Sequence, residues 1–470
     1  MSATATTEKK YLKWYQKLAY GSGDLASNCS YGLVSSFVLL YLTGTLGLDS
    51  AIIGSLMLAS KVLDGISDVI FGTLIDRTHS KLGKARPWML FGQVGVSLCL
   101  FLLFAIPAGS TTMQYIYFFI VYTALNAVFY TANGIAYSSL VALITKNNNE
   151  RVQLGSFRFM FAVVTNIFMG FAVTGMVEKF GSGAAGWRTT ALIFAIVGLV
   201  VNTISCLAVK ELPEEELSGN ASEAAEEGKA VAEEKKHGFA ETAKILVHNK
   251  YYLMILAIYI VYYIMSNLTT GAGVFCATYY WGDGSLLGQF SMMKMFPVII
   301  ALAIAPVLIK KTGSMQKVNF WGYAISSVLG IPMIYVAMQK NLSMFLLFMF
   351  IKGIFAGTLS GSLNALIAEA SGYTTRTTGI HMDGMMYSCS SLGVKVGGGI
   401  GTAAVGWLLK LGGFVGTATV QSESAIRMIF NLYITFPFVI GIIITVLLAF
   451  LDVEKANKKW DAEHQKEAQA

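Results

Sequence analysis

The sequence predicts an all-α membrane protein whose twelve transmembrane helices form two pseudo-symmetric halves of six. Of its 470 residues, 55% are apolar and only 13% are charged, whereas a soluble chain carries about 25% charged residues. The apolar residues form long continuous runs such as 436–451, not the alternation over about 10 residues that a β-barrel strand requires. An acidic, alanine-rich stretch, 211–245, separates six apolar segments from six more, a layout typical of transporters built from two repeats. This composition excludes a disordered chain, a coiled coil and an ordinary soluble enzyme.

Twelve segments are long and apolar enough to cross a bilayer, for which a helix needs about 20 residues. In chain order these predicted spans are 17–43, 51–75, 88–108, 113–142, 155–178, 189–209, 251–279, 286–309, 319–338, 344–367, 384–409 and 428–451. Residues 1–13 are polar, so we expect the first segment to be a span and not a cleavable signal peptide. The five cysteines are scattered among these segments, without the spacing of a metal site.

Basic residues set the expected orientation of the spans. The loop between spans 2 and 3 carries Arg77, Lys81, Lys84 and Arg86, whereas the loops after spans 1 and 3 carry no basic residue. Because positively charged loops stay in the cytoplasm, we expect both termini to be cytoplasmic. The net charge of +7 then reflects topology, and we expect no nucleic-acid partner.

The same analysis divides the chain into three parts. We expect an N-terminal six-helix half at 1–210, a cytoplasmic linker at 211–245, and a C-terminal six-helix half with a cytoplasmic tail at 246–470. The linker is rich in glutamate and alanine and has no large apolar run, so we expect it to be solvated.

Span 2 places two carboxylates and one ammonium on one helix face. At 100° per residue, Lys61, Asp64 and Asp68 fall within an arc of about 60°. Ionisable groups in a bilayer normally face a cavity or a partner, and carboxylates one turn apart repel each other unless a cation lies between them. The pattern predicts that Asp64 and Asp68 take up and release H⁺ or Na⁺. A structural salt bridge between Lys61 and one aspartate is the alternative, and it leaves the second aspartate unexplained.

Two further spans carry polar side chains at helical spacing. Asp24 and Asn28 are one turn apart in span 1, and Tyr130, Asn133 and Tyr137 form a stripe in span 4. Polar and aromatic groups together suit a sugar, whose hydroxyls form hydrogen bonds and whose ring face stacks on an aromatic ring. Hydrogen bonding between helices is the alternative for each residue taken singly.

Three further basic residues lie inside the predicted spans. Arg158 lies near the end of span 5, where snorkelling to the interface is the alternative. Lys294 lies about two turns inside span 8, where snorkelling is harder, and Lys352 lies in span 10.

Span 11 combines a glycine stripe with a lysine. Gly393, Gly397 and Gly401 are four residues apart, a spacing that lets two helices approach closely. Lys395 lies about 200° around the helix from Gly393 and Gly397, so it points away from that contact.

Four stretches of the chain together resemble one family of membrane transporters. They are YGSGDLASN (20–28), KVLDGISDVIFG (61–72), GTLIDRTHSKLGKARPW (72–88) and TGIHMDGMMYSCSSLGVKVGGGIG (378–401). The third is similar to the first cytoplasmic signature of the major facilitator superfamily. All four are similar to the glycoside–pentoside–hexuronide:cation symporters, the family of the melibiose permease and the glucuronide carrier. The resemblance extends over residues 15–455 and implies the major facilitator fold.

The resemblance also implies roles for single residues. Asp64 and Asp68 fall on the family's cation-site carboxylates, and Tyr130 falls where the melibiose permease has a threonine near the cation. Asn28 and Asn133 fall where that permease has sugar-binding aspartates. The full set expected to bind the substrate is Asp24, Asn28, Asn133, Tyr137, Arg158, Lys294 and Lys395.

We therefore expect a cation-coupled symporter of the bacterial inner membrane that imports a glycoside, pentoside or hexuronide, with glucuronides among the candidates. Its partners are the sugar, the coupling ion (H⁺ or Na⁺) and the bilayer; we expect a monomer without a further metal or cofactor. Asp76, Arg77 and Arg86, around the loop after span 2, are expected to act in gating. The alternative is a membrane sugar sensor that does not transport. A channel does not need paired carboxylates, and an enzyme needs a nucleophile–base pair or metal cluster that the five scattered histidines do not supply.

Overall fold

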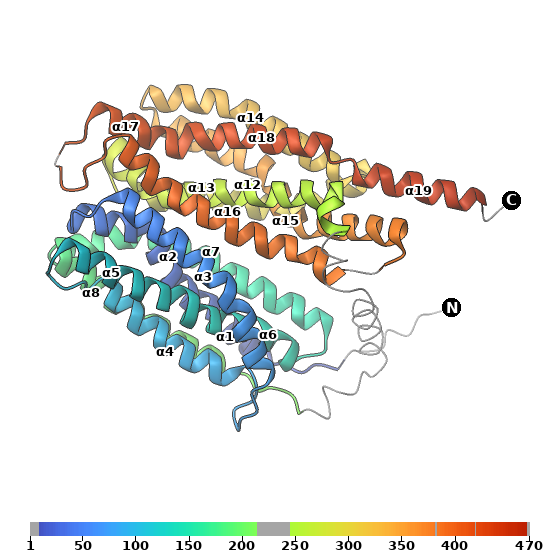
Figure 1. The fold of residues 1–470 in the computed structure, drawn as a ribbon, viewed down its shortest axis with the longest axis horizontal. Helices are drawn as coiled ribbons and strands as arrows, with labels where there is room; N and C mark the ends of the chain where they lie inside the picture. The colour runs from blue at the N-terminus through green and yellow to red at the C-terminus, as the bar shows by residue number, and fades with distance from the viewer. Residues whose placement is uncertain (1–8, 214–244, 381–382, 419, 468–470) are drawn as a thin grey trace. The chain divides into compact units, whose positions relative to one another are not determined.

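The computed structural model describes residues 9–213, 245–380, 383–418 and 420–467, and these residues form helices and loops without a β-strand. Most of the predicted linker, 214–244, lies outside the described residues. The predicted all-α fold is confirmed (Figure 1). The chain divides into two compact units: unit 1 is 1–219, 277–288 and 406–425, and unit 2 is 220–276, 289–405 and 426–470.

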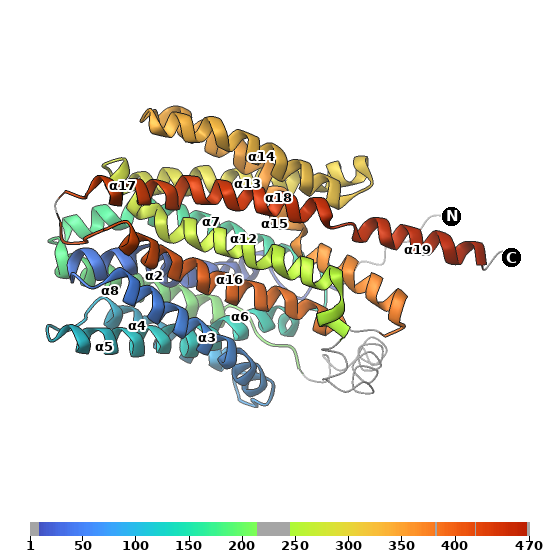
Figure 2. The ribbon, with the colours of Figure 1, turned by 45° about the horizontal axis from the view of Figure 1, so that its top comes forward.

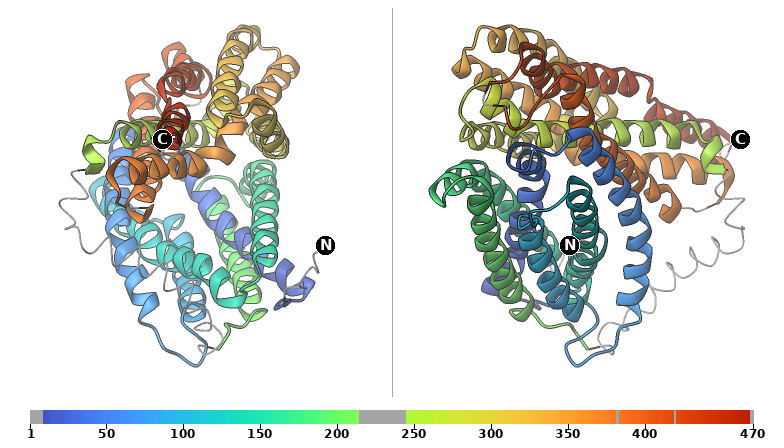
Figure 3. Two further views of the ribbon diagram at one scale, coloured as in Figure 1. Left: turned by 90° about the vertical axis from the view of Figure 1, so that its right-hand side faces the viewer. Right: turned by 60° about the vertical axis from the view of Figure 1, so that its left-hand side comes forward.

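Unit 1 is built mainly from the first six predicted spans. Its helices are α1 (Trp14–Gly21), α2 (Gly23–Leu40), the π-helical segment η1 (Tyr41–Thr45), α3 (Ser50–Asp76), α4 (Arg86–Leu103), α5 (Thr111–Thr123), η2 (Ala124–Tyr130), α6 (Thr131–Ile144), α7 (Asn148–Lys179) and α8 (Gly183–Leu207). Helix α2 packs against α7 and α8, and α4 packs against α6 and α8. Helix α3 packs against α5, η2 and α6. In Figure 3, α3 is the long blue helix that runs down to the loop before α4.

Unit 2 is built from the later spans. Its helices are α12 (Lys250–Phe275), α13 (Leu286–Thr312), α14 (Met315–Met338), α15 (Leu342–Thr378), α16 (Asp383–Leu411), α17 (Glu423–Phe430), the π-helical segment η4 (Asn431–Thr435), α18 (Phe436–Phe450) and α19 (Val453–Glu467). The short π-helical segment η3 (Cys276–Tyr280) follows α12, and the first residues of α13 and the end of α16 belong to unit 1. Helix α14 packs against α15 and α18, and α12 packs against α18 (Figure 2).

Eleven segments among the described residues are long and apolar enough to cross a membrane. Helix α3 is the twelfth helix of sufficient length, with 27 residues. It carries four charged residues, Lys61, Asp64, Asp68 and Asp76. The predicted spans agree with the helices except at their ends. Helix α4 ends at Leu103, where the prediction was 108, and α15 continues to Thr378, where the prediction was 367.

Short polar side chains begin many of these helices. Asp49 accepts hydrogen bonds from the backbone N–H groups of Ala51 and Ile52 at the start of α3. Asn147 does so at the start of α7, and Ser314 at the start of α14. Each cap satisfies N–H groups that have no partner inside the helix.

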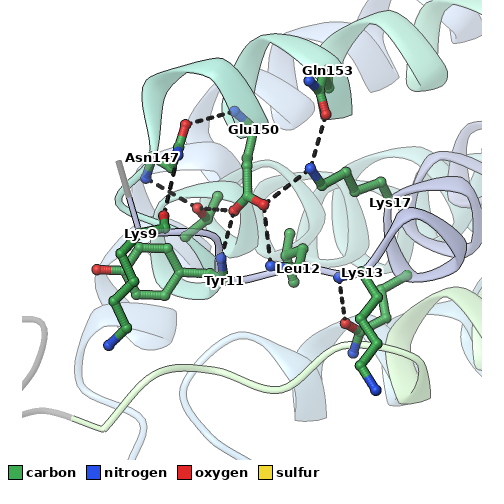
Figure 4. A network of polar contacts seen from close by, with 10 residues as sticks. Lys9, Tyr11, Leu12, Lys13, Lys17, Asn147, Glu150 and Gln153 are labelled. Atoms are coloured by element: carbon green, nitrogen blue, oxygen red, sulfur yellow. Dashed lines mark hydrogen bonds and ion pairs between the residues drawn. The ribbon is translucent and has the colours of Figure 1, made fainter. Parts of the chain in front are cut away.

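A buried carboxylate ties the N-terminal segment to α7. Glu150 accepts hydrogen bonds from the N–H groups of Tyr11 and Leu12, at 3.1 and 3.2 Å, and from the Thr145 hydroxyl at 2.7 Å (Figure 4). Lys17 Nζ lies 3.0 Å from the same carboxylate. Because all these donors converge on one charge, the residues before α1 are fixed on the start of α7.

Two other carboxylates fix loops in the same way. Glu211 accepts hydrogen bonds from three consecutive N–H groups, Lys84 to Arg86, at 2.7 to 3.0 Å, and so holds the start of α4. Glu454 accepts hydrogen bonds from Ser314 and from the N–H group of Gln316, and so ties α19 to the start of α14.

Candidate functional site

The charged face of α3 forms one half of the candidate site in unit 1. Lys61 Nζ lies 3.5 Å from Asp64 Oδ2, and the Thr131 hydroxyl donates a hydrogen bond to Asp64 Oδ1 at 2.6 Å. The Asp64 side chain is 13% exposed. Asp68 lies one turn further along the helix and is half-buried. The salt bridge that the sequence allowed as an alternative is therefore present, and a hydroxyl from α6 completes the surroundings of Asp64.

Thr131 is a residue that the sequence reasoning missed. The prediction named its neighbour Tyr130 as the residue near the cation, but the Thr131 side chain makes the contact with Asp64. Tyr130 instead stacks on Tyr31, with ring centroids 5.6 Å apart. The π-helical segment η2 ends at Tyr130 and α6 begins at Thr131, and a π-helical turn shifts the register of the side chains that follow it.

A second ion pair lies between α2 and α7. Arg158 Nε donates to Asp24 Oδ2 at 2.6 Å, and the two side chains are 24% and 18% exposed. The Arg158 guanidinium lies 4.1 Å from the centroid of the Tyr137 ring. A carboxylate and an aromatic face therefore hold Arg158 in place. An arginine that only snorkels to the membrane interface needs neither partner.

The Tyr137 hydroxyl donates to the backbone oxygen of Tyr20 at 2.7 Å, and Tyr137 is buried. Asn28 lies one turn after Asp24, donates to its backbone oxygen, and accepts a hydrogen bond from Asn166 at 2.9 Å. Tyr137 thus supports Arg158 through its ring face, and Asn28 extends the polar group along α2.

Two stacked tyrosine rings lie beside the Lys61–Asp64 pair. Tyr31 lies two turns after Asp24 on α2, and Lys61 Nζ lies 5.9 Å from its ring centroid. The stacked Tyr130 ring comes from the segment before Thr131. The surroundings of Lys61 and Asp64 thus combine two charges, a hydroxyl group and aromatic ring faces.

Asn133 is buried among three helices. This residue is 3% exposed, and its amide donates to the backbone oxygen of Met89 at 2.8 Å and to Asn202 at 3.4 Å. Asn202 donates to the same oxygen of Met89 at 2.9 Å. Asn133 therefore joins α6 to α4 and α8 by hydrogen bonds. Hydrogen bonding between helices was the alternative to sugar binding in the sequence analysis.

The predicted gating residues are divided between two environments. Asp76 and Arg77 are exposed at the end of α3. Arg86 is buried and donates to the backbone oxygens of Cys206 and Leu82, at 3.2 and 3.3 Å. In this conformation Arg86 is thus part of the packing around the start of α4, and the described residues show no ion pair between it and Asp76.

The glycine stripe of α16 packs against α12, as predicted. A Cβ atom at Gly393 would lie 2.4 Å from Tyr259 Cβ, and Cβ atoms at Gly397 and Gly401 would lie 2.4 and 2.6 Å from the carbonyl oxygens of Ile260 and Ile264. Only glycine permits backbones to approach so closely. Lys395, between the first two glycines, is half-buried.

Unit 1 also contains contacts between early and late parts of the chain. Asp49 Oδ2 lies 2.6 Å from Lys410 Nζ, and the Ser50 hydroxyl donates to the backbone oxygen of Gly406 at 2.9 Å. A Cβ atom at Gly406 would lie 2.2 Å from the Ser50 oxygen. The start of α3 and the end of α16 are therefore in close contact.

Lys294 and Lys352 line one cavity in unit 2. Lys294 Nζ donates to the hydroxyls of Thr269 and Thr270, at 3.3 and 3.4 Å. The cavity is also lined by hydroxyl groups from α12, α14 and α15. The cavity therefore combines two basic side chains with hydroxyl groups, all of them from unit 2.

Comparison with known proteins agrees with this architecture. Residues 19–455 match the family described as MFS/sugar transport protein. The isoprimeverose transporter of Lactiplantibacillus pentosus is 26% identical to this chain, over 98% of this chain and 93% of that protein. A putative glycoside/cation symporter of Escherichia coli (strain K12) is 23% identical, over 94% of this chain and 92% of that protein.

A solved structure shows the same fold. A bacterial homolog of the human lysosomal transporter Spinster, in an inward-facing and unoccupied conformation, has a TM-score of 0.65 and 13% identity, over 95% of this chain and 97% of that one. The fold and the family match together define a multi-pass membrane transporter and not an enzyme. This chain belongs to the MFS/sugar transport protein family.

Proposed function

We propose that the protein is a secondary symporter that couples the inward movement of H⁺ or Na⁺ to uptake of a glycoside, pentoside or hexuronide by alternating access. The observation that carries this proposal is the environment of Asp64. Its carboxylate lies in a spanning helix, 3.5 Å from the Lys61 ammonium and 2.6 Å from the Thr131 hydroxyl. A carboxylate in a membrane, with a second carboxylate one turn away, is a natural site for a transported cation.

The ion pair with Lys61 is compatible with this role. An arriving cation competes with the ammonium for Asp64, and the Thr131 hydroxyl and Asp68 supply further oxygen ligands. Release of the cation restores the pair with Lys61. The site therefore has a stable arrangement without the transported ion. A symporter needs such an arrangement, because it must change conformation without ion or substrate to complete its cycle.

The sugar is proposed to bind near Asp24 and Arg158. Their ion pair, with Asn28 beside it, offers both donors and acceptors to hydroxyl groups. The name of the Escherichia coli relative, a glycoside/cation symporter, supports this class of substrate and the coupling to a cation. Lys395 remains a proposed substrate residue, whereas Asn133 and Tyr137 serve as structural supports.

The end of α3 is proposed to act in gating. Asp76 and Arg77 lie exposed at the end of α3, where a charge contact can form in one conformation and break in another. The chain is proposed to lie in the bacterial cytoplasmic membrane as a monomer with both termini cytoplasmic, following the basic loops. The proposed halves remain 1–210 and 246–470.

The experiment that tests the function is uptake into proteoliposomes. Labelled glycosides, pentosides and hexuronides are supplied with a pH gradient or a Na⁺ gradient, applied separately. Accumulation of one sugar above its external concentration, driven by one of the gradients, supports the proposal. Binding of a sugar without accumulation under either gradient would instead identify a sensor.

A further inference from the structure

Two lysines enter the same cavity of unit 2. The cavity has a volume of about 180 Å³ and lies among α12, α13, α14, α15, η4 and α18. A water molecule needs about 10–15 Å³ of such space, so the cavity has room for a carboxylate with several waters. Lys294 comes from α13 and Lys352 from α15, and both are half-buried.

The close approach of α13 and α15 brings the two lysines to one place. A Cβ atom at Gly353 would lie 2.8 Å from Pro297 Cβ, and one at Gly357 would lie 2.7 Å from Ala301 Cβ. Lys294 is one turn before Pro297, and Lys352 immediately precedes Gly353. Measured at 1.5 Å per residue, they lie about 12 and 15 Å from the starts of two helices that are each long enough to cross a hydrocarbon core of about 30 Å.

The cavity has positive charge without a compensating carboxylate. Among the described residues that line it, none is acidic. Lys294 has two neutral threonine partners, and within the described part of the chain Lys352 has no hydrogen bond or ion pair. A cation at membrane depth is costly unless it meets an anion or water. Two such cations in one cavity point to an anionic ligand.

The remaining lining suits a sugar acid. Hydroxyl groups come from Tyr262, Ser266, Thr269, Ser326 and Ser360. The Tyr262 and Ser360 hydroxyls are 2.7 Å apart and form a hydrogen bond to each other. Hydroxyls accept and donate equally well, which matches the hydroxyls of a sugar ring.

We infer that this cavity binds the carboxylate of the transported substrate between Lys294 and Lys352, so that the substrate is a hexuronide and not a neutral glycoside or pentoside. The inference rests on the proposed function, which it deepens. Arg158 does not bind the substrate carboxylate, because Asp24 already neutralises the charge of Arg158. A lysine ammonium is a compact point charge, and two of them can share one carboxylate.

The test uses three sugars that differ at one carbon. The purified protein in lipid nanodiscs is titrated with the methyl glycosides of glucuronic acid, glucose and xylose, in both anomers. These carry a carboxylate, a hydroxymethyl group or only hydrogen at the same ring position. We expect the wild type to bind the glucuronide about tenfold or more tightly than the two neutral sugars. Lys294→Gln and Lys352→Gln should each reduce that preference to about threefold or less, and leave affinity for the neutral sugars within about twofold.

Matched variants separate charge from structure. Lys352→Arg keeps the charge and should keep much of the preference, and Lys310→Gln, at the exposed end of α13, should change nothing. Equal affinity for all three sugars in the wild type would overturn the inference, as would an equal loss of all three in the glutamine variants. If a neutral sugar is nevertheless accumulated with a cation gradient, the proposed function stands and only the inference fails. If no sugar is bound or accumulated, both fail.

Discussion

Arg158 Nε lies 2.6 Å from Asp24 Oδ2, and the Arg158 guanidinium lies over the Tyr137 ring at 4.1 Å. Three helices, α2, α6 and α7, thus meet at one arginine. The Arg158 charge is thus compensated by Asp24 within unit 1.

Removing the Asp24 charge should destabilise the protein by leaving Arg158 without its carboxylate. We expect Asp24→Asn to lower the free energy of unfolding by roughly 2 kcal/mol, the scale of a hydrogen bond to a charged group. Thermal unfolding of Asp24→Asn, Arg158→Gln and the double variant measures the coupling. Strictly additive losses would show that the two residues act independently.

Asp76 should affect the rate of transport and not the affinity for sugar. It is exposed at the end of α3, about 18 Å along the helix from Asp64. We expect Asp76→Ala to slow turnover and to leave the equilibrium affinity within a few-fold, since a surface charge pair biases a conformational equilibrium by about 1 kcal/mol. Initial uptake rates and sugar titrations on one preparation distinguish the two effects. Loss of sugar binding in folded Asp76→Ala would contradict a gating role.

The contact between Asp49 and Lys410 should persist to acidic pH. Burial alone would raise the pKa of Asp49, but the hydrogen bonds from Lys410 and from the N–H groups of Ala51 and Ile52 outweigh it and hold the pKa below its ordinary value of 3.8. Since the folded-state pKa is the lower one, the stabilisation is complete above the unfolded-state pKa and is lost as the pH falls through the folded-state pKa. Tyr115, whose hydroxyl accepts from the Asp49 N–H group, is the other titratable neighbour.

The contribution of the Asp49–Lys410 contact is measured by the difference in melting temperature between the wild type and Asp49→Asn. Asparagine keeps the helix cap and removes the charge. The difference should be constant from about pH 8 to pH 5 and shrink only below about pH 4. A difference that already disappears near pH 6 would show that another group controls this contact.

Gly397 should tolerate no side chain. A Cβ atom there would lie 2.4 Å from the Ile260 carbonyl oxygen, so Gly397→Ala must push α16 away from α12. We expect a loss of about 1–3 kcal/mol in stability together with reduced transport. Gly155→Ala is the control, because that glycine lies in α7 with open space around it. Alanine there should be neutral or slightly stabilising, and equal effects at both positions would refute the packing argument.

The fold could be predicted because membrane helices are read from long apolar runs. The glycine stripe could also be predicted, because residues four apart in a helix lie on the same face. Helix α3 was recognised by length despite its charges, and the same charges identified Asp64 and Asp68 as candidates. The Lys61–Asp64 pair was foreseeable because both residues lie on one helix, three residues apart.

Contacts between different helices could not be predicted in this way. Nothing in the sequence shows that Thr131 meets Asp64, or that Arg158 meets Asp24, 134 residues away. The same limit made Asn133 a candidate ligand, although it joins three helices. Lys294 and Lys352 were each visible as buried cations, but only the structure places them in one cavity.

The central claim is that Asp64 and Asp68 bind the coupling cation, and the most direct measurement is uphill sugar accumulation by Asp64→Asn and Asp68→Asn in proteoliposomes. The sugar used is the one that the wild type accumulates. Thr131→Val keeps both carboxylates and should weaken the accumulation without abolishing it. We predict that both asparagine variants lose accumulation under either cation gradient and still exchange sugar down its own gradient. Accumulation at the wild-type level by both variants would contradict the assignment of the cation site.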